Sequence, residues 1–103
     1  MLEAIFTGLP DGFVPGVITS PTSFYFSLGE CKKTVQLSAD RCLVSDGRVV
    51  AEADCVCKTS PDFFLRIWEE GYRPGMMDFL GGTIKSNKPE LLQTFLRCFG
   101  KAS

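Results

Sequence analysis

The spacing of apolar side chains changes near Ser60, and this change constrains the fold more than any other feature. Several segments between residues 22 and 59 place apolar side chains at every second position, as half-buried strands do. After Ser60 the apolar side chains recur at three- and four-residue spacing, which is typical of helices that bury one face. The predicted order of helix, strands, helix, helix, strand and helix indicates an α+β fold.

The first half of the chain is predicted to form antiparallel strands. In residues 22–28, phenylalanine and leucine side chains share one face, and serine and tyrosine side chains share the other. A hairpin turn leads to a second strand at 33–38, and a third, short strand covers 41–44. A longer strand covers 50–59. With residues 83–85 as the last strand, we expect a mostly antiparallel five-stranded sheet.

Two helices are predicted directly after this region. Ser60 suits the N-cap of the first, Pro61 suits its first position, and Gly71 ends it. Pro74-Gly75 opens a second, short helix, and Gly81-Gly82 closes it. Because glycines bracket the short helix, it is expected to be able to act as a lid.

A helix is also predicted at each end of the chain. Residues 2–7 carry apolar side chains at helical spacing, and we expect Gly8 and Pro10 to end that helix. Asn87 is expected to cap the last helix, and Gly100 suits its C-terminal end. The helices are predicted to cover one face of the sheet, because their apolar faces need a common surface to bury.

Length and charge limit the class of protein. The 103 residues fit a single domain over 1–103, and with 45% hydrophobic residues they can form a core. The net charge is −1 with no basic stripe, which argues against nucleic-acid binding and against a polybasic membrane-surface segment. No stretch is long enough to span a membrane, and the N-terminus lacks a signal-peptide pattern, so the expected location is the cytoplasm.

The sequence lacks the combinations of side chains that nucleophilic catalysis and zinc binding commonly use. There is no histidine, which excludes Ser-His and Cys-His nucleophile pairs. The five cysteines have no zinc-ligand spacing, and Cys55 and Cys57 would lie on one face of a strand as buried thiols. We therefore expect neither an enzyme nor a resident metal or cofactor.

Several segments together resemble one known family. They are a strand carrying Asp54, the run Ser60-Pro61-Asp62-Phe63-Phe64, the run from Pro74 to Lys85, and a terminal amphipathic helix. In order and spacing these features resemble the sterol carrier protein type 2 family, most closely over residues 50–100. Phe24-Tyr25-Phe26 also matches the aromatic alternation in the first strand of that family.

This resemblance implies a non-catalytic domain with an apolar tunnel between the sheet and the helices. Members of the family hold fatty acids, acyl-CoA, phospholipids or sterols in such a tunnel. The residues leave an alternative open, in which these side chains fill an ordinary core and the domain binds no ligand. The domain would then serve as an interaction or dimerisation module. In either case it could act beside a partner enzyme. The ligand-binding residues expected from the sheet, the middle helices and the last helix are Phe24, Phe26, Phe64, Ile67, Trp68, Met76, Met77, Phe79, Leu80, Leu92, Phe95 and Leu96.

Overall fold

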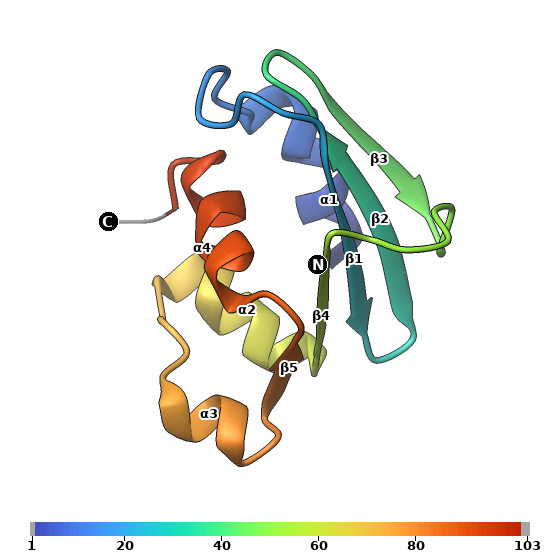
Figure 1. Cartoon of the computed structure of the whole chain (residues 1–103). Helices are drawn as coiled ribbons and strands as arrows, with labels where there is room; N and C mark the ends of the chain where they lie inside the picture. Colours follow the sequence, from blue (N-terminus) through green and yellow to red (C-terminus); the bar gives the residue numbers. More distant parts are fainter. Residues whose placement is uncertain (1, 102–103) are drawn as a thin grey trace.

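The computed structural model describes residues 2–101, so residues 1, 102 and 103 of the expected domain lie outside the described part (Figure 1). The strands are β1 (Thr22–Leu28), β2 (Cys31–Leu37), β3 (Cys42–Asp46), β4 (Cys55–Thr59) and β5 (Ile84–Ser86). The helices are α1 (Leu2–Gly12), α2 (Pro61–Glu70), α3 (Met76–Leu80) and α4 (Pro89–Arg97). The element order confirms the α+β class, with the expected hairpin between β1 and β2.

The five strands form one mixed sheet in the order β3-β2-β1-β4-β5. Three neighbouring pairs are antiparallel, but β1 and β4 are parallel, with Phe24 beside Cys55 and Leu28 beside Thr59. The expected mostly antiparallel meander is therefore wrong at the centre of the sheet. The alternation of apolar side chains sets which face of a strand is buried, but it is the same for either strand direction.

A loop explains how β4 comes to lie parallel to β1. Residues 47–54, of which 50–54 were expected to begin the fourth strand, instead cross the sheet surface that the helices leave open (Figure 1). Thr34 Oγ1 donates to the carbonyl of Gly47 and accepts from the Val49 N–H, at 2.7 and 3.3 Å. The Arg48 guanidinium lies 5.3 Å from the Tyr25 ring centroid. These contacts hold the loop on the open face and return the chain to the edge of β1.

Helices α1, α2 and α4 cover the other face of the sheet (Figure 1). Most strand residues that point toward them are apolar, but Lys33 also lies on this face, and its side chain is 7% exposed. Its amine donates to the carboxylates of Glu3, at 2.6 Å, and of Asp46. These hydrogen bonds raise the pKa of Lys33 and join α1 to the edge of the sheet, because each partner lies on a different element.

Helix α1 is longer than predicted. It continues past Gly8 and Pro10 to Gly12, because Leu9 is buried and extends the apolar stripe begun by Phe6. The missing N–H of Pro10 costs only one intrahelical bond near the helix end, so packing outweighs the local signal.

The caps of α2 are as predicted, whereas Asn87 has another role. Ser60 Oγ accepts from the Phe63 N–H at 3.1 Å, and Gly71 ends the helix with φ of 73°. Asn87 Oδ1 accepts from the Val56 N–H at 2.7 Å, so it ties the start of α4 to β4 and does not cap the helix. Gly100, with φ of 68°, follows the last turn of α4 as expected.

Candidate hydrophobic-ligand site

A cluster of phenylalanine rings fills the space between the sheet and the helices. Phe24 and Phe26 come from β1, Phe64 from α2 and Phe95 from α4, and each is at most 1% exposed. The ring centroids of Phe24 and Phe26 lie 5.0 and 4.9 Å from that of Phe95. The structure therefore brings these four predicted residues together, as a set of rings packed against one another.

Most of the other predicted residues on α2 and α4 surround this cluster. Ile67, Leu92 and Leu96 are buried around the rings. Trp68 is only partly buried, and its ring stacks on Phe64 with centroids 6.0 Å apart. Trp68 therefore lies between the phenylalanine cluster and the protein surface.

The predicted residues on α3 lie elsewhere. Met76, Met77 and Leu80 are 77, 78 and 74% exposed, and Phe79 is half-buried. Helix α3 projects from the lower end of the molecule in Figure 1, away from the helix-covered face of the sheet. The structure leaves Met76, Met77 and Leu80 in solvent, whereas Phe79 packs against the edge of the hydrophobic core. The assignment of all four as ligand-binding residues stays a prediction.

An apolar cleft opens beside Trp68, between α1 and the end of α4. It has a volume of about 360 Å³ and is lined by Ala4, Ile5, Gly8, Leu9, Gly12, Trp68, Phe99 and Lys101. Of these, only Trp68 was predicted as a ligand-binding residue. The apolar spacing of residues 2–7 was the available signal for Ile5, but it does not reveal which side of the helix remains accessible.

Lys101 provides a positive charge at this cleft. Its amine lies 5.0 Å from the Trp68 ring centroid, within the range of a cation–π interaction. The Lys101 carbonyl accepts a hydrogen bond from the Arg73 guanidinium, and its N–H donates to the Leu96 carbonyl at 2.9 Å. The backbone of Lys101 is thus fixed, while its amine remains at the cleft.

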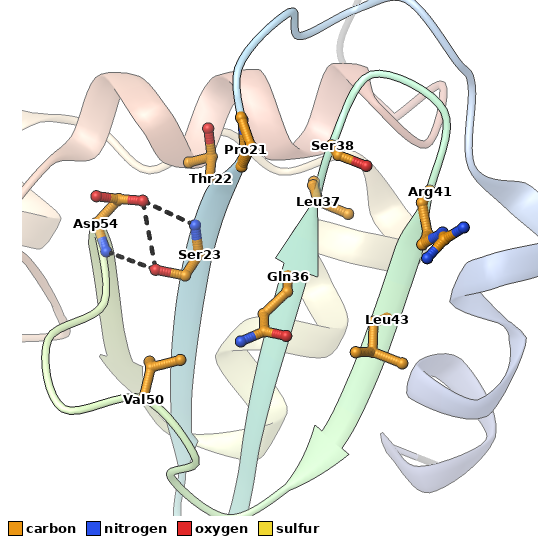
Figure 2. Close-up of a pocket in the computed structure, with 10 residues that line it drawn as sticks. All are labelled: Pro21, Thr22, Ser23, Gln36, Leu37, Ser38, Arg41, Leu43, Val50 and Asp54. Carbon is orange, nitrogen blue, oxygen red and sulfur yellow. Dashed lines mark hydrogen bonds between the residues drawn. The ribbon is translucent and has the colours of Figure 1, made fainter.

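A second pocket, of about 470 Å³, lies on the open face of the sheet (Figure 2). At one edge Asp54 Oδ2 accepts from the N–H and the hydroxyl of Ser23, at 2.9 and 3.3 Å. This network joins the start of β4 to the start of β1. The lining mixes polar side chains, among them Gln36 and Arg41, with Leu43 and Val50, so it suits a polar group better than an alkyl chain.

The buried cysteines within residues 2–101 are held as neutral thiols. Burial raises the pKa of the Cys57 thiol to about 12 and that of Cys42 to about 11, so both are neutral near pH 7. In that part of the chain no three Cys, Asp or Glu side chains gather as metal ligands would.

Comparison with known proteins bears on this arrangement. No protein-family model and no curated protein matches the sequence. The structure is similar to sterol carrier protein 2-like 2 from Aedes aegypti, with a TM-score of 0.54 and 15% identity over 92% of this chain and 91% of that chain. The chain has the sterol carrier protein 2-like fold.

The same fold occurs within a larger protein. The structure is also similar to part of the sec-alkylsulfatase Pisa1 from Pseudomonas sp., with a TM-score of 0.75 and 14% identity. That match covers 100% of this chain and 16% of the sulfatase chain, so this chain spans about a sixth of the enzyme's length.

Within residues 2–101, no helix is both long and apolar enough to cross a membrane.

Proposed function

We propose that this sterol carrier protein 2-like chain binds an amphiphile with an alkyl chain and an anionic head, such as a fatty acid, without catalysing a reaction. The observation that carries the proposal is the apolar cleft beside Trp68, which adjoins the phenylalanine cluster and has one cationic side chain, Lys101, at its edge. The fold shared with a sterol carrier protein supports the same reading.

The size of the cleft is adequate for such a ligand. Its volume of about 360 Å³ lies at the lower end of the range of small-molecule sites. Ile5 and Trp68 offer apolar surface, with the buried Leu9 and Phe99 completing the lining. Burying an alkyl chain there gains about 25 cal/mol for each Å² removed from water. The Lys101 amine would pair with a carboxylate head group.

Two aromatic rings separate the cleft from the deeper cluster. The Phe99 ring centroid lies 5.7 Å from that of Trp68 and 4.9 Å from that of Phe95. Rotation of the Phe99 and Trp68 side chains would connect the cleft with the space around Phe95 and Phe24. We propose that a longer chain enters by this route, so that the tunnel implied by the family forms only when the ligand is bound.

Native mass spectrometry with palmitate tests the proposal. The protein is first unfolded and refolded to remove bound lipid, and palmitate is then titrated. A Gly8→Phe variant should fill the cleft, since a Cβ at Gly8 meets nothing within 4 Å. Gly8→Ala is the matched control, because it changes helix propensity in the same direction and adds only a methyl group. We expect a one-to-one complex for the original chain and Gly8→Ala, and its loss in Gly8→Phe.

A second candidate is a domain that holds the alkyl part of a substrate for an enzyme. The likeness to part of a sec-alkylsulfatase favours it. An alkyl sulfate has the same chemistry as the first ligand class, an alkyl chain with an anionic head. In the same spectra, an alkyl sulfate below its micellar concentration that displaces palmitate would favour this candidate, and failure to displace would favour a carboxylate-specific carrier.

A further inference from the structure

Three lysines form a row across the open face of the sheet. Ser27 on β1 pairs with Lys32 on β2 and with Lys58 on β4, and Lys58 pairs with Lys85 on β5. The four residues therefore lie side by side on four neighbouring strands, on the face away from the helices. They come from distant parts of the sequence, so no basic run marks this row in the chain.

No acidic side chain in the described part of the chain forms an ion pair with the row. Within residues 2–101 the ion pairs are those of Lys33, on the other face, and the Lys32 amine donates to Ser27 Oγ and the Gly29 carbonyl, at 3.0 and 2.6 Å. Like charges directly opposite on neighbouring strands, as in Lys58 and Lys85, repel each other. The three lysines also line one concave surface of about 470 Å³.

The concave surface that holds the lysine row reaches the segment that follows α3. Gly82, two residues after the end of this helix, lines the same concave surface, and a Cβ there would lie 3.9 Å from Lys85 Cε. The Gly82 N–H donates to the Phe79 carbonyl at 3.3 Å. Figure 1 shows α3, β5 and the turn between β1 and β2 together at the lower end of the molecule. Helix α3, with its exposed apolar residues, and the parts of β2, β4 and β5 that carry the lysines thus lie at the same end of the molecule.

We propose that this end, formed by Met76, Met77 and Leu80 together with the lysine row, docks onto the surface of an anionic lipid membrane. Exposed apolar side chains can enter the interface between head groups and acyl chains, while lysines attract anionic lipids. Charge complementarity favours this occupant over a second copy of the chain, because two copies would place like-charged rows together. The docking surface is distinct from the Trp68 cleft and does not depend on ligand binding there.

Vesicle flotation tests the proposal. We expect the lipid-free full chain to float with phosphatidylcholine vesicles that contain phosphatidylserine, far more than with phosphatidylcholine alone. Lys58→Gln with Lys85→Gln should lower the partition coefficient about 30-fold, at about one tenfold step per 1.4 kcal/mol. Arg41→Gln with Arg97→Gln is the matched control, because it changes net charge equally at exposed sites elsewhere.

The apolar part is tested in the same way. Met76→Ser with Met77→Ser should weaken binding at least about tenfold. Leu43→Ser with Val49→Ser, which also removes two exposed apolar side chains, should leave binding unchanged. Equal flotation with both vesicle types, no flotation, or equal loss in the control variants would overturn the proposal. Concentration-dependent dimerisation that only the methionine variant abolishes, without vesicle binding, would assign the surface to a second copy.

Discussion

Helices α2 and α3 follow each other in the chain and have similar residue patterns, yet α2 is packed in the core and α3 is largely exposed to solvent. Each begins beside a proline and ends at a glycine, and each carries several large apolar side chains. Helix α2 buries Phe63, Phe64 and Ile67 against the sheet and α4, whereas α3 buries none of its residues. Local composition therefore does not determine which apolar side chains form the core.

Length and tethering account for the difference. With ten residues, α2 places apolar side chains on successive turns, so one stripe can meet the sheet. With five residues, α3 makes little more than one turn, and only its Phe79 packs against the hydrophobic core. Asp78 accepts from the Tyr72 hydroxyl and the Gly75 N–H, at 2.6 and 2.9 Å, so the helix is closed locally.

The largest expected difference between the helices comes from truncating their apolar side chains. Phe64→Ala should lower the free energy of unfolding by about 3–5 kcal/mol, because it leaves a cavity among packed rings. Met77→Ala should change it by less than about 0.5 kcal/mol, because the side chain is already in solvent. Urea unfolding followed by circular dichroism measures both. Similar losses for the two variants would show that α3 belongs to the core.

The N-caps offer a smaller contrast. Ser60→Ala removes the acceptor for the Phe63 N–H and should cost about 1 kcal/mol of unfolding free energy. Gly75→Ala is the counterpart in α3, where the cap has no side-chain acceptor and a Cβ meets nothing within 4 Å. Its effect on the same urea transition should be within about 0.5 kcal/mol. A larger loss of unfolding free energy for Gly75→Ala than for Ser60→Ala would contradict the account in which α2 contributes more than α3 to global stability.

Alkaline pH should weaken the core that α2 covers before it affects α3. Burial raises the pKa of Cys57 from 9.0 to about 12, so the folded state keeps a proton that the unfolded state loses between these values. The contribution of the neutral Cys57 thiol to the free energy of unfolding is complete below pH 9 and is lost as pH rises toward 12. Urea midpoints of the original chain and Cys57→Ala, measured over this range, should converge. Parallel curves would show that Cys57 titrates alike in both states.

The smallest effect on the global stability of the fold is expected from substitution of Asp78. Hydrogen bonds from the Tyr72 hydroxyl and the Gly75 N–H lower the pKa of this carboxyl below its usual value of 3.8. Its contribution is present above that value and is lost as pH falls through the lower, folded pKa. In Asp78→Asn, hydrogen exchange should quicken at the amides of residues 75–81, while the global urea midpoint stays unchanged. A shift of the global midpoint would mean that α3 unfolds with the core.

The sequence predicted much of the architecture because the relevant signals are local. The alternation in residues 22–28 and the Ser60-Pro61 cap identified β1 and the start of α2. The direction of β4 could not be found in this way, since it depends on where residues 47–54 cross the sheet. The lysine row was equally inaccessible, because strand pairing brings Lys32, Lys58 and Lys85 together across 53 positions of sequence.

The residues of the candidate site were predicted only where local sequence patterns were sufficient. Phe24, Phe26, Phe64 and Phe95 lie on the helix-covered face, as alternation and helical spacing require. The exposure of Met76, Met77 and Leu80 was missed, because a stripe of apolar residues predicts a buried face only when another element lies against it. Lys101 was missed because its place beside Trp68 depends on how the chain turns after α4.

Quenching of Trp68 by a brominated palmitate tests the central claim most directly, since Trp68 is the only tryptophan in the chain. Bromine quenches an indole at close contact, so the signal reports both binding and its location. We predict saturable quenching at one fatty acid per protein in the original chain and in Gly8→Ala, and none in Gly8→Phe. A complex seen by native mass spectrometry without quenching of Trp68, or no complex at all, would contradict ligand binding in this cleft.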